Sequence, residues 1–313
     1  MQRLLTHFET AQGCRPDTRF LGIEVETLLV TPSGRFNVPI SEGQSQRIMA
    51  CLSSLPYWKV GEIKGGKIVL VKNGEYIVFY ELGWNNYELV VPPKPISASR
   101  HLFEETRERL GCLYQYAEAN AAHAFVGPYD FFAEHDTLML PDKRDEVWKE
   151  LDGPVLRILG HIASVHYTVD VTCVEEAFEF IRCLEQLRRE RVTWPARESE
   201  QIWRRYVAES YAGYEQNRYG TAPTTFGSYC EALASMKVVM NRPNGELVRF
   251  NPALPFTQTQ SVDMDLFLRS VWWWERLRVR NGRLMLEIRD IPRGPDEDIE
   301  HNWRLIADCL GLS

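Results

Sequence analysis

Apolar and charged residues alternate along Phe20–Val30, a segment that is rich in Ile, Val and Leu. This alternation predicts a β-strand with one apolar and one polar face. Because residues i and i+2 of a strand point to the same side, Glu24 and Glu26 share a face with Gly22. Two like charges on a sheet are costly to bury unless a cation lies between them. The segment therefore indicates either a divalent-metal site on a sheet or an ordinary solvated strand face.

A three-stranded antiparallel meander is the clearest local prediction. Lys67–Lys72 and Glu75–Glu81 are apolar strands on either side of Asn73-Gly74, a dipeptide typical of tight hairpins. A third strand follows at Tyr87–Val91, and the two prolines after it are expected to end it.

The remaining elements are predicted from the spacing of apolar residues, which recur every second residue in a strand and about every 3.6 residues in a helix. Helices are expected over residues 1–12, 45–55, 99–120, 174–192, 199–218 and 263–279, and from Pro295 onward. Strands are expected at 123–126, 164–171, 236–240, 246–250 and 283–290, with an irregular loop at 127–155. Antiparallel strands that are interleaved with helices in no regular βαβ order predict an α+β fold with helices packed on one face of a sheet.

Composition narrows the class of protein. Of the 313 residues, 44% are hydrophobic and 25% are charged, as in ordinary globular proteins. The net charge of -7 argues against a nucleic-acid partner. No apolar run approaches the roughly 20 residues that cross a bilayer, and the N-terminus has no signal-peptide core. Seven scattered cysteines without zinc-site spacing indicate reduced thiols, so a cytoplasmic protein that does not bind membranes is expected.

Three further segments repeat the pattern of the first strand. Glu81 ends one strand of the meander, and Glu88 lies inside the next. His166 shares a polar face with other residues of the strand at 164–171, and Glu287 alternates with apolar residues beside Arg289. Each has an ordinary alternative: a solvated carboxylate, a hydrogen-bonded core histidine, or a surface ion pair of little energetic weight.

If these strands are neighbours in one curved sheet, their polar faces line a common cavity. Its residues are Glu24, Glu26, Glu81, Glu88, His166, Glu287 and Arg289. Five carboxylates against one arginine and one histidine call for counter-charge, and such hard oxygen ligands suit Mg²⁺ or Mn²⁺. Because Mg²⁺ characteristically accompanies nucleotide phosphates, the cavity indicates phosphoryl transfer from ATP.

The motifs in this order resemble the glutamate–cysteine ligase family, which belongs to the glutamine-synthetase-like carboxylate–amine ligases. The resemblance rests on Gly22–Glu26, the Glu81-to-Glu88 segment before prolines, a Val-His strand at His166 and a late Glu-Ile-Arg at Glu287. It covers residues 20–290 and implies one catalytic domain over 1–313, with insertions around 127–160 and 172–235. The implied fold is a curved antiparallel sheet that forms an active-site funnel, with helices on its outer face.

The family implies a role for each motif. Two or three Mg²⁺ ions and ATP bind in the funnel, a substrate carboxylate attacks the γ-phosphate, and an amine takes the acyl group. Carried over by position, the metal ligands are Glu24, Glu26, Glu81, Glu88, Glu287 and His166. His166 also matches a nucleotide contact, and Arg289 the phosphate-facing arginine. Asn217–Gly220 is similar to a substrate-side motif, which makes Arg218 a candidate catalytic residue together with Glu287 and Arg289.

The substrates stay open at this point. Ser164 stands where many relatives have a second histidine, and no segment marks a cysteine pocket. The leading hypothesis is a ligase that couples glutamate to an amine such as cysteine. The alternatives are the same chemistry on another amino acid or amine in a specialised pathway, a metal-dependent phosphohydrolase that works without ATP, and a relative without catalysis. Small-molecule substrates are expected, and a homo-oligomer is left open.

Two further expectations follow from these residues. Either Glu24→Gln or Glu287→Gln should abolish ATP turnover and leave the fold intact, since each removes one metal ligand. Trp272, Trp273 and Trp274 cannot all face the core from one helix, so two are expected to pack and one to lie near the surface or a substrate loop.

Overall fold

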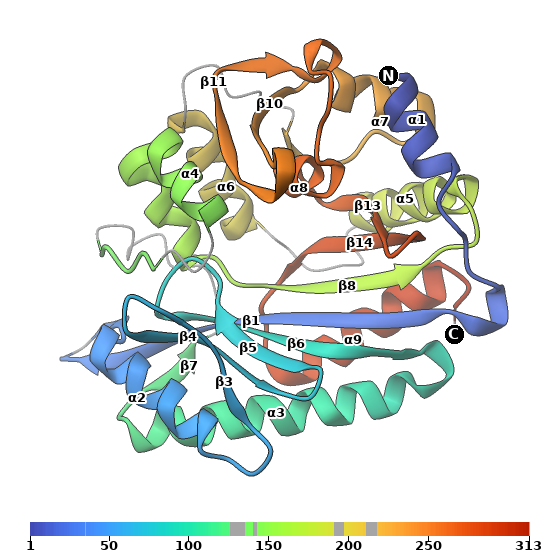
Figure 1. Ribbon diagram of the computed structural model, residues 1–313. Helices are drawn as coiled ribbons and strands as arrows, with labels where there is room; N and C mark the ends of the chain where they lie inside the picture. Colours follow the sequence, from blue (N-terminus) through green and yellow to red (C-terminus); the bar gives the residue numbers. More distant parts are fainter. Residues whose placement is uncertain (35, 126–134, 140–142, 191–196, 211–217, 313) are drawn as a thin grey trace.

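A single large antiparallel sheet organises the chain (Figure 1). The computed structural model describes residues 1–34, 36–125, 135–139, 143–190, 197–210 and 218–312. Within these residues the sheet has ten strands, of which eight follow the order β13-β14-β8-β1-β6-β5-β4-β3, while β2 and β7 pair with β1. The strands are β1 (Phe20–Ser33), β2 (Phe36–Pro39), β3 (Lys59–Lys64), β4 (Lys67–Asn73), β5 (Tyr76–Tyr80), β6 (Asn86–Pro95), β7 (His123–Phe125), β8 (Ser164–Asp170), β13 (Glu275–Arg280) and β14 (Arg283–Pro292).

Helices cover the apolar face of this sheet. They are α2 (Glu42–Ser53), α3 (Ser99–Ala119), α5 (Val174–Arg189) and α9 (Asp296–Cys309). Ile23 and Val25 of β1 are buried in the core that these helices form with the sheet. Tyr167 of β8 donates a hydrogen bond to the backbone carbonyl of Ile299 in α9, which fixes that helix against the strand. The large antiparallel sheet with helices packed on it confirms a mixed α and β fold.

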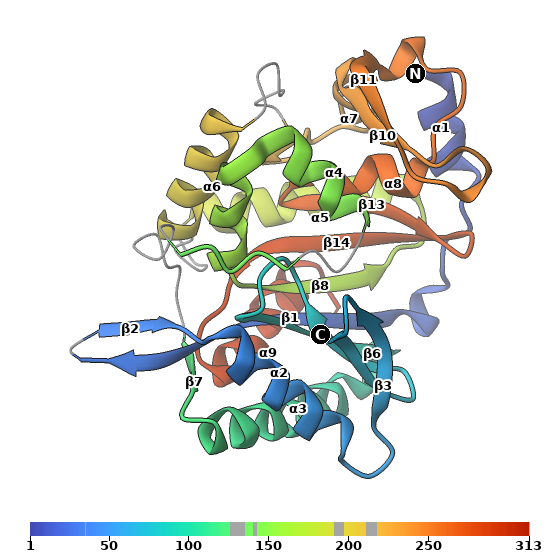
Figure 2. The ribbon, with the colours of Figure 1, turned by 60° about the vertical axis from the view of Figure 1, so that its left-hand side comes forward.

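Smaller elements lie on the other side of the sheet (Figures 1 and 2). They include α4 (Lys143–Asp152), the 3₁₀ segment η4 (Gly153–His161), α6 (Arg197–Glu209), α8 (Met264–Arg269), and the short parallel pair β9 (Tyr219–Gly220) and β12 (Trp272–Trp273). The hairpin of β10 (Lys237–Asn241) and β11 (Val248–Pro255), with α7 (Phe226–Ser235) and α1 (Gln2–Glu9), stands at one end. Trp148, Leu156 and Tyr206 belong to a second hydrophobic core beneath α4 and α6.

The meander is confirmed, with one difference at its end. β4, β5 and β6 are consecutive antiparallel neighbours, and Gly74 takes a left-handed φ of 60° in the turn. The prolines at 92 and 93 do not end β6, which continues to Pro95. Residues beyond Val91 still pair with β1, on which Phe20 lies opposite Pro95. The sequence prediction also missed β3, which pairs with β4.

The predicted helix at 263–279 is wrong. The structure has a helix only to Arg269, followed by β12 and by β13. Ser270 ends the helix, and Asn281 and Gly282 form the two-residue turn of a hairpin, with φ values of 53° and 77°. Positive φ at both turn residues is the geometry that joins two antiparallel strands most tightly.

Residues 127–155 are not wholly irregular, because α4 occupies Lys143–Asp152. The remaining parts of that prediction at 126–134 and 140–142 lie outside the described residues, as do 211–217 of the helix predicted at 199–218. Each of the described helices is too short or too polar to cross a membrane.

Acid is expected to destabilise the fold through His161, which is 1% exposed at the end of η4. Burial lowers the pKa of its imidazole to about 4 from an ordinary value of 6.5. Between these pH values the unfolded chain binds a proton that the folded protein does not. Titration of His161 therefore does not lower the free energy of unfolding while the pH is above 6.5. As the pH falls from 6.5 to 4, the free energy of unfolding decreases by about 3 kcal/mol because of this group.

Urea unfolding of the wild-type protein and of His161→Gln at about pH 7 and about pH 4.5 measures this contribution. His161→Gln should show a smaller loss of unfolding free energy between the two conditions. The matched control is His301→Gln, which replaces an exposed histidine. Equal pH dependence in the two variants would contradict the assignment.

Candidate functional site

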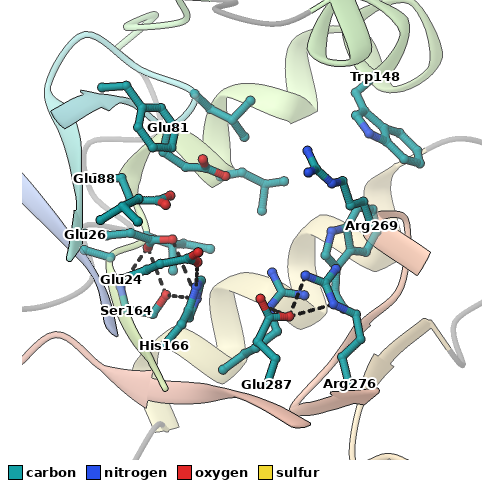
Figure 3. A pocket seen from close by; sticks show the side chains of 18 of the residues that line it. Glu24, Glu26, Glu81, Glu88, Trp148, Ser164, His166, Arg269, Arg276 and Glu287 are labelled. Carbon is teal, nitrogen blue, oxygen red and sulfur yellow. Dashed lines mark hydrogen bonds and ion pairs between the residues drawn. The ribbon is translucent and has the colours of Figure 1, made fainter. Parts of the chain in front are cut away.

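A cavity of about 920 Å³ opens on the polar face of the sheet. Its floor comes from β1, β4, β5, β6, β8, β13 and β14, and its opposite wall comes from α4, η4, α6 and β12. Figure 3 shows four carboxylates on one side, and on the other side arginines, a tryptophan and Glu287, which lies beside Arg276. This volume lies in the range of small-molecule sites, which favours a ligand-binding role.

Three carboxylates converge at one end of the cavity. Glu26 of β1 lies directly opposite Glu88 of β6 in the antiparallel register, and Glu81 follows the last residue of β5. One oxygen of each carboxylate lies within 4.8 Å of the others. Glu26 and Glu88 are 7% and 6% exposed, so water screens their repulsion poorly.

The environment of these groups disfavours negative charge in the absence of a cation. Burial, followed by the charges of Glu24, Glu81 and Glu26, raises the pKa of Glu88 well above its ordinary value. Burial likewise raises the pKa of Glu26 to about 7, although His166 and hydrogen bonds from Ser164 oppose the shift. A divalent cation would relieve the repulsion, and three hard oxygen donors fit Mg²⁺ or Mn²⁺.

A histidine and a serine hold the neighbouring carboxylates in place. Glu24 lies opposite His166 in the register of β1 with β8, and its Oε2 is 3.3 Å from His166 Nδ1. Ser164 donates to Glu26 Oε2 from its backbone N–H at 2.8 Å and from its hydroxyl at 2.9 Å. The same hydroxyl lies 2.8 Å from His166 Nε2. Ser164 therefore links the two carboxylates through the imidazole (Figure 3).

These contacts shift the pKa values of His166 and Glu24 in opposite directions. Burial alone would lower the pKa of His166, but the hydrogen bond with Glu24 and the charge of Glu26 raise it overall. Burial would raise the pKa of Glu24, but the same hydrogen bond is among the interactions that lower it. The pair is thus favoured as an imidazolium beside a carboxylate.

Glu287 is surrounded by arginines. Its Oε2 accepts from Arg276 Nε at 2.7 Å, and its Oε1 accepts from Arg278 NH1 at 3.1 Å. Arg289 Nε lies 3.7 Å from Oε2. Burial opposes ionisation of Glu287, but these three cations lower its pKa overall. Glu287 is therefore a buried anion that holds an arginine cluster together.

The structure brings most of the predicted site residues to one cavity. Those that line it are Glu24, Glu26, Glu81, Glu88, His166, Glu287 and Arg289. Among the described residues, however, the carboxylate cluster consists of Glu26, Glu81 and Glu88, so the structure does not bring Glu287 into it. The predicted metal ligands are thus divided between a carboxylate cluster, a Glu24–His166 pair and an arginine-bound glutamate.

Arg218 is not brought to the cavity wall. It is fully buried, and its NH1 donates to the carbonyl of Ser270 at 3.1 Å and to the hydroxyl of Ser270 at 2.7 Å. Its NH2 donates to the carbonyl of Lys237. These contacts tie β9 to the end of α8 and to β10, which is a structural role. Asn217 of the same motif lies outside the described residues.

Sequence reasoning missed the arginines of β13. Arg276, Arg278 and Arg280 line the cavity and alternate with Leu277 and Val279 along the strand. This strict alternation, followed by Asn281-Gly282, was the available signal, and the helix predicted there obscured it. The expectation that one arginine faces five carboxylates is therefore wrong, because Glu287 has its own counter-charges.

The three consecutive tryptophans also differ from their prediction. They belong to β12 and the residue before β13, and not to a helix. Trp273 is buried, Trp272 and Trp274 are half-buried, and all three line the cavity.

No protein-family model matches the chain, and a search of curated proteins gives no match either. Its function is therefore inferred from its motifs and from the geometry of the cavity.

Proposed function

We propose that the chain is an ATP- and Mg²⁺-dependent carboxylate–amine ligase with a glutamine-synthetase-like fold, similar to glutamate–cysteine ligase. One observation carries this proposal: a buried carboxylate cluster and an arginine cluster face each other across one cavity on an antiparallel sheet. Carboxylates that can hold a divalent cation and arginines that can hold phosphate are the two requirements of phosphoryl transfer from a nucleotide. A cytoplasmic enzyme is consistent with seven free thiols.

Each group of residues has a distinct role in this proposal. Glu26, Glu81 and Glu88 would hold Mg²⁺ or Mn²⁺, which when bound neutralises polyphosphate charge and polarises the phosphorus centre. His166 and Ser164 orient the carboxylates by hydrogen bonds. Arg289 lines the cavity, and its side chain is 19% exposed there, so its guanidinium can bind a phosphoryl oxygen while its Nε stays beside Glu287.

The proposed reaction has two steps. In the first, an oxygen of the substrate carboxylate attacks the γ-phosphorus, and the bond to the β-phosphate oxygen breaks to release ADP. In the second, the nitrogen of the amine attacks the acyl carbon, inorganic phosphate leaves, and the nitrogen loses a proton. The amide product is therefore lighter than the two substrates together by one water. Glutamate is the carboxylate that the family resemblance suggests, and cysteine is one candidate amine.

The first test is release of ADP and phosphate by the purified protein with Mg-ATP and glutamate, against a panel of amines that begins with cysteine. Release that depends on both substrates, together with a product of the expected mass, would establish the ligase. Phosphoester hydrolysis without ATP that survives Arg289→Gln would instead favour the phosphohydrolase. No nucleotide turnover with any pair would reject the ligase.

A further inference from the structure

The wall opposite the carboxylates is built from aromatic rings. Six of its residues are Trp148, Trp203, Tyr206, Tyr219, Trp272 and Trp274. They come from α4, α6, β9, β12 and the residue before β13. Segments that are far apart in the sequence thus contribute rings to a single surface, which we call the aromatic wall.

The rings of the aromatic wall support one another. Trp203 and Tyr219 are stacked, with centroids 5.1 Å apart and planes 15° from parallel. Trp272 lies at the centre, 5.4 Å from the ring of Trp148, 5.6 Å from Trp203 and 5.7 Å from Tyr206. Each ring restricts its neighbours, so the wall is pre-organised before a ligand arrives.

Core packing explains only part of this wall. Trp148 and Tyr206 are buried in the second hydrophobic core, whereas Trp203, Tyr219 and Trp272 are half-buried and lie at its edge. These three rings retain exposed surface inside a concave site that also holds the carboxylate cluster. Apolar surface held open in a preformed cavity favours an apolar or aromatic part of a ligand.

Charge at the wall selects the class of ligand. Arg269 ends α8 three residues before Trp272 and lines the same cavity, with its guanidinium directed inward (Figure 3). Its ion pair with Asp265, at 3.3 Å, joins two side chains that are 39% and 53% exposed, so this pair is weak. An arginine here disfavours a cationic side chain and favours a carboxylate.

We infer that the aromatic wall and Arg269 bind an amino acid with a planar aromatic side chain, which serves as the amine substrate. The ring lies against Trp203 and Trp272, and the α-carboxylate pairs with Arg269, while the amino group faces the side where the acyl group forms. This inference rests on the proposed ligase and names its second substrate. A cysteine side chain is too small to cover these rings.

Binding without turnover tests the inference separately from the ligase. Isothermal titration of the whole protein with L-phenylalanine, L-tryptophan and L-cysteine, in the absence of ATP, should show saturable binding of the aromatic amino acids, about tenfold tighter than that of cysteine. Trp203→Leu should weaken binding of phenylalanine about tenfold. Arg269→Gln, at a partly exposed position, provides a second variant if the first does not fold.

A matched pair of ligands tests the role of Arg269. Arg269→Gln should weaken binding of phenylalanine about tenfold and leave binding of phenethylamine, which lacks the carboxylate, within about twofold. Cysteine binding as tightly as phenylalanine would overturn the inference. So would weakening of ATP binding, and not of amino-acid binding, by Trp203→Leu, because the wall would then hold the nucleotide base.

The outcomes also separate the two proposals. Aromatic amino acids that bind, with no ADP release by any pair of substrates, would retain the aromatic site and reject the ligase, and with it the role of these amino acids as amine substrates. ADP release that depends on cysteine, with no binding of aromatic amino acids, would retain the ligase and reject the aromatic site.

Discussion

Glu88→Gln is expected to stabilise the metal-free protein and to abolish its Mg²⁺-dependent turnover. In the folded protein the carboxyl of Glu88 is buried opposite Glu26 and beside Glu81, so its pKa is raised by burial and by like charge. Glutamine has nearly the same shape and no charge. At neutral pH the fold must either keep a proton on Glu88 or bury its charge beside like charges, which lowers stability by up to about 3 kcal/mol at pH 7, and glutamine avoids this loss. The same change removes one of three proposed metal ligands.

The sign of the pH dependence follows from the raised pKa. The folded protein holds a proton on Glu88 at pH values where the unfolded chain has lost it, so stability decreases as the pH rises above the ordinary value of 4.5. The advantage of Glu88→Gln should therefore be largest near neutral pH and should shrink as the pH falls toward 4.5.

Thermal melts with a chelator and with excess Mg²⁺ measure the stability of the metal-free protein and its stabilisation by Mg²⁺. Wild-type protein should melt at higher temperature with Mg²⁺, whereas Glu88→Gln should start higher with the chelator and gain little from Mg²⁺. Glu104→Gln, which removes a 49% exposed carboxylate of α3, is the matched control and should behave as the wild type. A full Mg²⁺ shift in Glu88→Gln would remove this residue from the metal site.

Glu287→Gln is expected to lower the free energy of unfolding by about 3 to 5 kcal/mol. The reason is that Glu287 is 1% exposed and is the shared partner of Arg276, Arg278 and Arg289. Loss of its charge leaves buried guanidinium groups without compensation. Because the pKa of Glu287 is lowered in the fold, its contribution is complete above the ordinary pKa and is lost only in strong acid.

Urea unfolding near neutral pH measures this loss, and Glu24→Gln is the comparison. Glu24 is 26% exposed and is paired with a single histidine among the contacts described above, so its replacement should cost far less. The sequence alone predicted that both variants keep the fold and lose turnover. The surroundings of Glu287 change that expectation, because loss of activity in this variant would include loss of folded protein. Equal stability of the two variants would contradict the arginine-cluster interpretation.

The local pattern was sufficient to predict strands β1, β4, β5, β6, β8 and β14 because each has one face in a core and the other toward polar surroundings. Pairing between distant strands was not encoded in this pattern. Leu21 lies opposite Val169, and Glu287 lies opposite Thr168, across separations of more than a hundred residues. The neighbouring positions of Glu24 and His166 were therefore a hypothesis until the register was known.

The candidate site was predicted in part for a related reason. Alternation indicated which carboxylates share a strand face, but it could not indicate which would meet an arginine. The segment from Val271 to Trp274 is continuously apolar, so neither the two-residue period of a strand nor the roughly 3.6-residue period of a helix was evident there. The helix predicted from residue 263 was therefore extended through it. That error hid the counter-charges of Glu287. Arg218 shows the converse, because a short motif match does not distinguish a substrate contact from a buried arginine that binds backbone carbonyls.

The order in which the strands leave the ribosome has a consequence for the newly made chain. The carboxylate cluster comes from residues 26–88, and the neighbouring strand β8 ends at Asp170, whereas the arginines that surround Glu287 lie in β13 and β14. β14 is also the strand that pairs with the free side of β8. Until Arg283–Pro292 has been synthesised, the nascent protein therefore presents an unpaired β8 edge beside a group of acidic side chains. Charged side chains near an open edge oppose its pairing with another chain, so we expect the carboxylates that are proposed to bind metal in the finished protein to reduce aggregation of the unfinished one.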